Sequence, residues 1–150
     1  AVLELRRDGA TLVLTVDAPF HGDPPPPGPP GTWPGLWEFE VVELFLLGPG
    51  DRYLEVEIGP FGHHLVLKLH GRRQVQESGL PLALDAAIAG GRWRAEARLP
   101  EAWIPPGPLE ANAYAIHGLG AERRYLCWRP TGGERPDFHR LEAFGAVELP

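Results

Sequence analysis

Short segments in which apolar and polar residues alternate make up most of the chain. The alternation is clear in "TLVLTVDAPF", "RYLEVEIGP" and "RWRAEARLP", and Gly or Pro bounds most segments of this kind. A period of two places successive side chains on opposite faces of a strand, and regularly spaced short strands are typical of sandwiches and barrels. The pattern predicts an all-β, antiparallel, jelly-roll-like sandwich of about nine strands. Only "PEAWIPPG", residues 100–107, is predicted to form a helical turn.

One stretch cannot belong to the interior of such a sheet. Residues 21–35 read "HGDPPPPGPPGTWPG". Proline has a fixed φ angle and no backbone N–H group, so it is excluded from helix interiors and central strands. We therefore expect a Pro/Gly-rich surface loop here. No internal repeat divides the rest of the chain, and residues 1–150 are predicted to form a single β-sandwich domain.

Charge and composition narrow the expected partners and compartment. A net charge of −6 argues against nucleic acid, which requires a basic surface, and no apolar run approaches the roughly 20 residues of a membrane span. The single cysteine, Cys127, cannot form an internal disulfide, which favours a reducing compartment and predicts a cytoplasmic protein. The 18 prolines and the absence of Met suit a thermostable protein, although a GC-rich genome would produce the same bias.

Three acids interrupt the apolar stretch "LWEFEVVELFLL", residues 36–47. If the whole stretch is a strand, Glu43 lies on the same apolar face as Phe45. A buried carboxylate without a partner is costly. We therefore predict that Glu43 is structural and buried, and that His139 or Arg140 in "PDFHRLEAFG" satisfies it.

The stretch "YLEVEIG", residues 53–59, separates apolar from polar residues most clearly. Its apolar residues share one face, and Tyr53, Glu55 and Glu57 share the other. We expect these three side chains to be at least partly exposed. They form either a plain solvated face or the polar floor of a binding groove.

The five tryptophans offer rings that could pack in a core or stack on a ligand. Trp93 and Trp103 are predicted to be core residues. Trp33 and Trp37 flank the proline-rich loop and are predicted to line a surface groove.

Several of these motifs occur in the same order in known families. "LWEFEVVELF", "YLEVE", "AIHG" and "PDFHRLE" resemble an uncharacterised family of small proteins from bacteria and animals. The stretch from Glu38 to Leu149 also resembles the family 9 carbohydrate-binding modules. That resemblance implies a β-sandwich, often with structural calcium, that holds sugar ends between aromatic rings. The Asn-aromatic-Arg pattern of those modules appears as Asn112, Tyr114 and His117, without the arginine.

The leading functional hypothesis is a non-catalytic sandwich that binds a small polar ligand in a groove, with a carbohydrate as the expected ligand. The residues predicted to line this groove are Glu40, Tyr53, Glu55, Glu57, His64 and His117. One alternative is a glycoside-type hydrolase that uses the same carboxylates and histidines. Another is a protein-interaction module that presents the proline-rich loop or a sheet face. No cofactor is expected, structural calcium is allowed, and the oligomeric state stays open.

Overall fold

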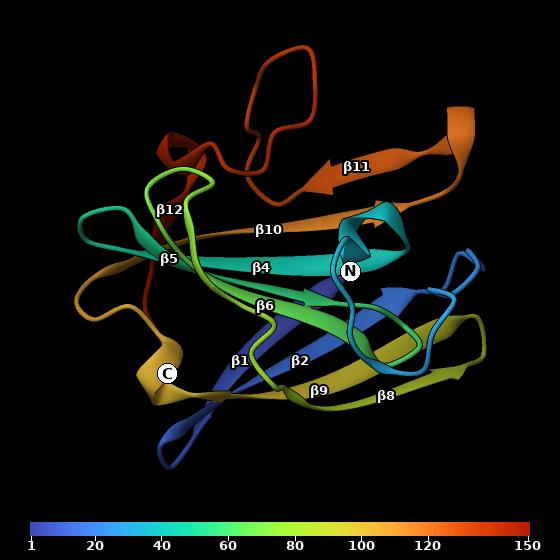
Figure 1. Cartoon of the computed structure of the whole chain (residues 1–150), viewed down its shortest axis with the longest axis horizontal. Helices are drawn as coiled ribbons and strands as arrows, with labels where there is room; N and C mark the ends of the chain where they lie inside the picture. The colour runs from blue at the N-terminus through green and yellow to red at the C-terminus, as the bar shows by residue number, and fades with distance from the viewer.

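Two sheets face each other in the computed structural model, which describes residues 1–150 (Figure 1). The smaller sheet has four strands, in the order β1 (Val2–Asp8), β2 (Thr11–Pro19), β9 (Arg92–Pro100) and β8 (Ala83–Ala89). The main path of the larger sheet is β11 (Arg124–Cys127), β10 (Leu109–His117), β4 (Val41–Gly48), β5 (Arg52–Ile58), β6 (His63–His70) and β3 (Gly31–Thr32). Two further strands join it, since β12 (Gly145–Val147) pairs with β10 and β7 (Val75–Ser78) pairs with β6. The predicted all-β sandwich is confirmed.

The details depart from the prediction at short elements. There are twelve strands rather than about nine, and β3, of two residues, pairs with β6 in parallel. The predicted helical turn is present as a 3-10 turn at Glu101–Trp103. The strand predicted over residues 36–47 begins only at Val41, because Leu36–Glu38 form another 3-10 turn after the left-handed Gly35. All helical segments are turns of three residues, and none is long enough to cross a membrane.

The main core lies between the two sheets. Alternate residues of β2 and β9 face alternate residues of β4, β5 and β6 across this layer. The largest of them is Trp93, which is 1% exposed and is the core residue that its sequence context predicted. Leu54, Val56 and Ile58 of β5 also belong to this core, as their alternation predicted.

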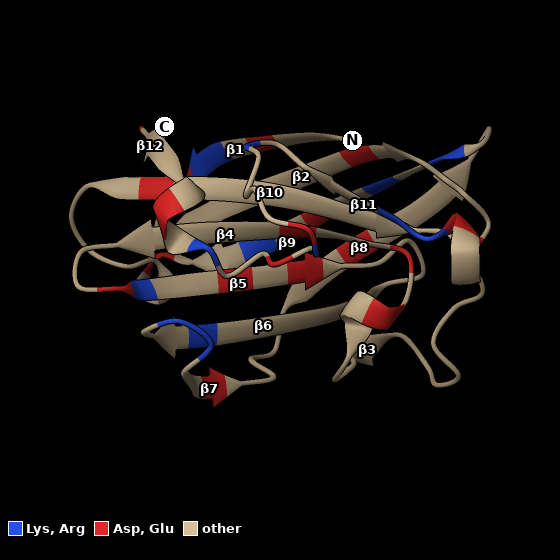
Figure 2. Ribbon diagram, turned by 90° about the horizontal axis from the view of Figure 1, so that it is seen from above, with Lys and Arg blue, Asp and Glu red and all other residues tan.

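The two outer faces of the sandwich differ. On the four-stranded sheet, Asp17 binds Arg92 and Arg94 at the surface, and the strands of this sheet carry residues of both charges (Figure 2). The outer face of the eight-stranded sheet instead carries a second apolar cluster, whose buried members are Leu36, Val41, Phe45, Leu47, Tyr53, Leu65, Leu67, Leu69, Tyr114, Ile116 and Phe144. Strand β5 is therefore buried on both faces.

The second cluster corrects one expectation from the sequence. Tyr53, Glu55 and Glu57 share a face, as predicted, but they are only 2%, 4% and 0% exposed. The predicted exposure is wrong because loops cover this face. Trp33 and Phe39, near the end of the proline-rich loop, pack on one part, and Phe138 packs on another.

The proline-rich loop is tied to the body of the protein. Both carboxylate oxygens of Glu40 are used, since they accept hydrogen bonds from the backbone N–H groups of His21, at 3.0 Å, and Asp23, at 3.4 Å. The Asp23 carboxylate accepts in turn from the N–H of Gly118 at 2.6 Å. Glu40 thus ties the loop to the start of β4, and Asp23 ties it to the end of β10.

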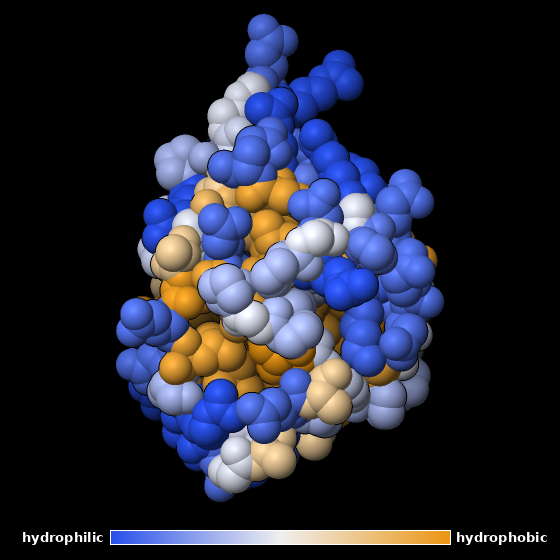
Figure 3. Space-filling model, turned by 90° about the vertical axis from the view of Figure 1, so that its left-hand side faces the viewer, coloured by the Kyte–Doolittle hydropathy of each residue, from blue (hydrophilic) through white to orange (hydrophobic).

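One end of the sandwich leaves apolar atoms visible at its centre. Hydrophilic residues surround this apolar area on the face shown in Figure 3. This end of the sandwich therefore exposes apolar surface.

Candidate functional site

A cavity of about 650 Å³ opens on the covered outer face of the eight-stranded sheet. Its floor comes from β4, β5, β6 and β10, and its walls come from loops and from the edge strands β7 and β11. We call it the acidic pocket. The residues that line it are Trp37, Glu38, Glu43, Glu55, Leu67, Leu69, Arg73, Val75, Ile116, Leu119, Gly120, Arg123, Tyr125, Pro136, Asp137, Phe138 and His139.

Three buried carboxyl groups gather at the floor of the acidic pocket. Glu43 of β4 pairs with Glu57 of β5 in the antiparallel ladder, and Phe45 pairs with Glu55. Directly opposed residues of two strands point to the same side of the sheet, so the three acids share one face. Figure 2 shows the acidic bands on β5 in the middle of the sheet. Glu43 and Glu55 line the cavity, and Glu57 lies beside Glu55 beneath the surface.

Burial raises the pKa of all three carboxyl groups. Burial raises the pKa of Glu55 to about 7. Burial and the charge of Glu55 raise the pKa of Glu43 well above its usual value. Burial and the charges of Glu43 and Glu55 raise the pKa of Glu57 to about 11. The floor therefore retains protons at neutral pH.

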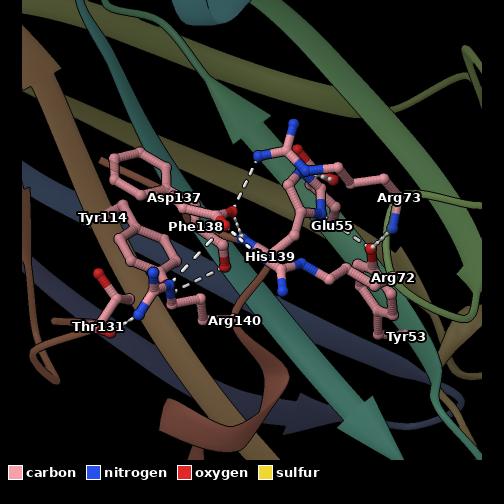
Figure 4. A network of polar contacts seen from close by, with 10 residues as sticks. All are labelled: Tyr53, Glu55, Arg72, Arg73, Tyr114, Thr131, Asp137, Phe138, His139 and Arg140. Carbon is pink, nitrogen blue, oxygen red and sulfur yellow. Dashed lines mark hydrogen bonds and ion pairs between the residues drawn. The ribbon is translucent and has the colours of Figure 1, made fainter. Parts of the chain in front are cut away.

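A hydrogen-bonded chain orients His139 above the floor (Figure 4). The hydroxyl oxygen of Tyr53 accepts from the backbone N–H of Arg73 at 3.0 Å and lies 2.8 Å from His139 Nδ1. Because the hydroxyl already accepts one bond, its own proton can be donated to Nδ1, which leaves the imidazole proton on Nε2. Nε2 faces Glu55 Oε2 at 3.9 Å, a distance too long for a direct hydrogen bond. Burial and the charge of Arg73 lower the pKa of His139 to about 4, so the ring is neutral.

Asp137 fixes the segment that covers the pocket. Its carboxylate binds Arg72 and accepts from Arg73 at 2.8 Å and from the backbone N–H of His139 at 3.2 Å. Burial opposes ionisation, but the hydrogen bond and charge of Arg73 hold the pKa of Asp137 below its usual value. Arg140 lies 3.8 Å away from the same carboxylate (Figure 4). This acid is thus ionised and joins two separate loops.

We expect Tyr53→Phe to destabilise the protein by roughly 1–3 kcal/mol, because it leaves the Arg73 N–H and His139 Nδ1 without their partner. Urea denaturation of the variant measures this loss. Tyr125→Phe is the matched control, since Tyr125 is 47% exposed and should shift stability by no more than about 0.5 kcal/mol. Equal small shifts for both variants would show that the buried hydroxyl does not support the site.

Two exposed aromatic rings stand at the rim of the acidic pocket. Trp37 is 49% exposed and Tyr125 is 47% exposed. Arg123 joins them, because it donates to the backbone oxygen of Trp37 at 2.6 Å and to that of Gly118 at 3.0 Å, while its guanidinium lies 5.8 Å from the centre of the Tyr125 ring. The rim therefore presents aromatic surfaces held by a cation that is already hydrogen-bonded.

The structure brings together only part of the predicted groove. Glu55 lines the acidic pocket, and Tyr53 and Glu57 support it from below. Glu40 anchors the proline-rich loop, and two histidines also lie away from the pocket. His64 Nε2 lies 3.3 Å from the hydroxyl of Thr32 and accepts from the N–H of Leu82 at 3.4 Å, and His117 stacks on His21 with ring centres 3.5 Å apart. The prediction of one groove containing all six residues is wrong, because residues of opposite strand faces and of different loops cannot share it.

The predicted role of Glu43 also needs correction. Its burial is confirmed, at 2% exposure. Its predicted partners are wrong, since His139 bonds to Tyr53 and faces Glu55, and Arg140 donates to the backbone oxygen of Thr131 and lies near Asp137. Glu43 and His139, assigned structural roles from the sequence, both line the acidic pocket.

The charged residues of the rim were missed from the sequence. Arg73, Arg123 and Asp137 lie in loops, where no strand alternation indicates the direction of a side chain. The neighbouring arginine pairs in "GRRQ" and "ERRY" were a weak signal, because the first pair follows β6 closely and the second lies at the start of β11.

A second hollow, of about 700 Å³, lies on the four-stranded sheet. Its charged residues Asp17, Arg92 and Arg94 already pair with one another at the surface. Across the whole chain, no three His, Cys, Asp or Glu side chains come together in a set that could hold a metal ion. The acidic pocket is therefore the better candidate site.

Comparisons with known proteins place the chain in a family. No protein-family model matches it. The UPF0462 protein C4orf33 homolog of Danio rerio is 47% identical over 142 residues, which cover 89% of this chain and 72% of that protein. The Homo sapiens UPF0462 protein C4orf33 is 42% identical over 89% of this chain and 71% of its own length. The chain belongs to the UPF0462 family.

The fold of this UPF0462 protein also occurs in a solved structure. A protein from Bacteroides uniformis, described as a "putative carbohydrate-binding protein", superposes with a TM-score of 0.74. The match covers 99% of the UPF0462 chain and 77% of the other, with 18% sequence identity. At this identity the likeness shows a shared sandwich fold.

Proposed function

We propose that the acidic pocket binds a small polar ligand, and that this ligand is a carbohydrate. The observation that carries the proposal is the pairing of exposed rings, Trp37 and Tyr125, with buried carboxyl groups, Glu43 and Glu55, in one cavity. A sugar ring has an apolar face that packs on an aromatic ring and hydroxyl groups that need hydrogen-bond partners. The size of the cavity, about 650 Å³, also lies in the range of small-molecule sites.

Two further observations support a carbohydrate. The protonated floor can donate as well as accept hydrogen bonds, which suits hydroxyl groups. The similar fold from Bacteroides uniformis is described as carbohydrate-binding, which makes sugars the first ligands to test.

We expect Trp37→Ala and Tyr125→Ala each to weaken binding of a sugar roughly threefold to tenfold, because each removes one stacking surface. Isothermal titration calorimetry against a panel of monosaccharides and disaccharides measures the affinities. Trp128→Ala is the control, since Trp128 is 57% exposed and lies outside the acidic pocket. The proposal fails if no sugar binds, or if Trp128→Ala weakens binding as much as the two rim variants.

Glycoside hydrolysis is the second candidate, and the floor carboxyls favour it. Two carboxyl groups line one cavity, and the pKa of Glu55 is raised to about 7, where a general acid can work. Hydrolysis would require turnover of aryl glycosides that disappears in Glu55→Gln while sugar binding persists. If the unaltered protein binds sugars but shows no turnover, hydrolysis is excluded and non-catalytic binding is the function.

A further inference from the structure

The floor of the acidic pocket carries carboxyl groups that the protein leaves without a donor. Glu43 and Glu55 line the cavity at 2% and 4% exposure, and the buried Oε2 atom of Glu55 has no hydrogen-bond partner. Both side-chain oxygens of Glu57 are also buried without one. A carboxyl group that loses its proton when a ligand binds can only accept hydrogen bonds, so a ligand that ionises it must bring donors. We therefore expect a ligand to supply the hydrogen-bond donors that these carboxyl groups lack.

The cations around the pocket are already engaged. Arg73 donates to Asp137 at 2.8 Å, and Arg123 donates to backbone oxygens, including that of Trp37 at 2.6 Å. His139 is neutral and receives its hydrogen bond from Tyr53. None of these groups donates a hydrogen bond to a carboxyl group at the floor, although the charge of Arg73 offsets part of the rise that burial causes in the pKa of Glu55. The free electrostatic complement of the pocket is a positive charge.

A molecular cation fits this floor better than a bare metal ion. The acids do not come together with a third ligand in a set that could hold a metal ion. A protonated primary amine instead brings three N–H donors on one charged centre. The rings of Trp37 and Tyr125 at the rim also attract a cation through their faces.

Resting on the proposed function, we infer that the ligand is an amino sugar, whose ammonium group is bound by Glu43 and Glu55 while its ring packs on Trp37 and Tyr125. Protons and charges are conserved when the amino sugar binds. The ammonium keeps its three protons, the carboxyl group that it meets gives up one proton to the solvent, and an ion pair replaces a neutral acid. A neutral sugar has no such charge and leaves the proton in place.

Calorimetric titration at about pH 6 with D-glucosamine, D-glucose and N-acetyl-D-glucosamine tests this inference. We expect D-glucosamine to bind at least about tenfold more tightly than the other two, because a charged hydrogen bond adds about that much. Its heat should depend on the ionisation enthalpy of the buffer, and that of D-glucose should not. Equal affinities would overturn the inference and leave the proposed function intact. If none of the three binds, the proposed function fails and the inference fails with it.

Two variants and two probes locate the effect. Glu55→Gln and Glu43→Gln should each reduce the preference for D-glucosamine over D-glucose about tenfold, whereas Glu110→Gln, an exposed acid of β10, should preserve it. Circular dichroism checks that each variant folds.

Cyclohexylamine, an amine without hydroxyl groups, should bind at least about tenfold more weakly than D-glucosamine, and equal binding would overturn the choice of a sugar. Calcium that competes with D-glucosamine would show that the acids serve a metal and would also overturn the inference.

Discussion

Raising the pH from 6.5 to 9 is expected to destabilise the protein strongly. Glu43, Glu55 and Glu57 have raised pKa values in the folded state, so the unfolded chain releases their protons near the ordinary value of 4.5 and the folded protein retains them. Their stabilisation is complete below that value and is lost as the pH rises through the folded pKa. For Glu55 this loss ends at about 7, and for Glu57 it continues above pH 7. His139 has the opposite dependence, but its contribution is complete above its ordinary pKa of 6.5.

The loss amounts to about 1.4 kcal/mol for each pH unit and each group that stays protonated only in the folded state. Between pH 6.5 and 9, Glu57 alone should lower the melting temperature by on the order of 5–10 °C. Differential scanning calorimetry at several pH values measures this fall. Glu57→Gln should flatten it, since an amide does not titrate, and Glu110→Gln should retain it. A melting temperature that stays constant up to pH 9 in the unaltered protein would mean that the acids are hydrated and ordinary.

Phe45→Ala should destabilise the protein by about 3–5 kcal/mol, the usual range for a buried phenylalanine. Phe45 is fully buried on the outer face of the eight-stranded sheet. Its ring lies 5.2 Å from that of Tyr114, 5.4 Å from that of His139 and 5.8 Å from that of Phe144, measured between ring centres. Removing the ring leaves a cavity directly under the segment that contains His139 and Phe144. Chemical denaturation gives the free energy of unfolding.

Trp128→Ala serves as the control for the loss of a large aromatic ring. Trp128 is 57% exposed and packs against the guanidinium of Arg129, with 4.5 Å to the ring centre. Its removal should change stability by no more than about 1 kcal/mol, the usual worth of an exposed cation–π contact. If Phe45→Ala is as mild as this control, the outer layer is not a packed core.

The strand alternation was readable from the sequence because it depends only on local geometry. It correctly placed Leu54, Val56 and Ile58 in the core between the sheets and put Glu55 and Glu57 on one face together. It failed before Val41, because the left-handed Gly35 and the 3-10 turn after it end the alternation. Turns of this kind depend on a single backbone conformation and carry little periodic signal.

The burial of the site could not be predicted in the same way. Whether a strand face meets water depends on which distant segment covers it, and Phe138 and Phe144 follow Glu55 by more than eighty residues. A lone carboxylate among apolar residues suggested an internal partner for Glu43, and that rule failed because the acids cluster with one another. A buried carboxylate usually pairs with a cation or a hydrogen-bond donor. A cluster of acids that retains its protons is an exception, and such exceptions occur mainly at functional sites.

The segment that covers the acidic pocket, between residues 128 and 144, should limit how quickly a bound ligand dissociates. No strand lies between residues 128 and 144, and the segment is held mainly by side chains, among them Asp137 and the hydroxyl of Tyr114, which donates to the backbone oxygen of Phe138 at 3.0 Å. A segment without ladder hydrogen bonds opens at a lower free energy than the strands beneath it. Its amides should exchange with deuterium before those of β5, and a ligand beneath it should leave no faster than the segment opens. The residence time of the ligand would then be set by the contacts of Asp137 rather than by the affinity of the floor.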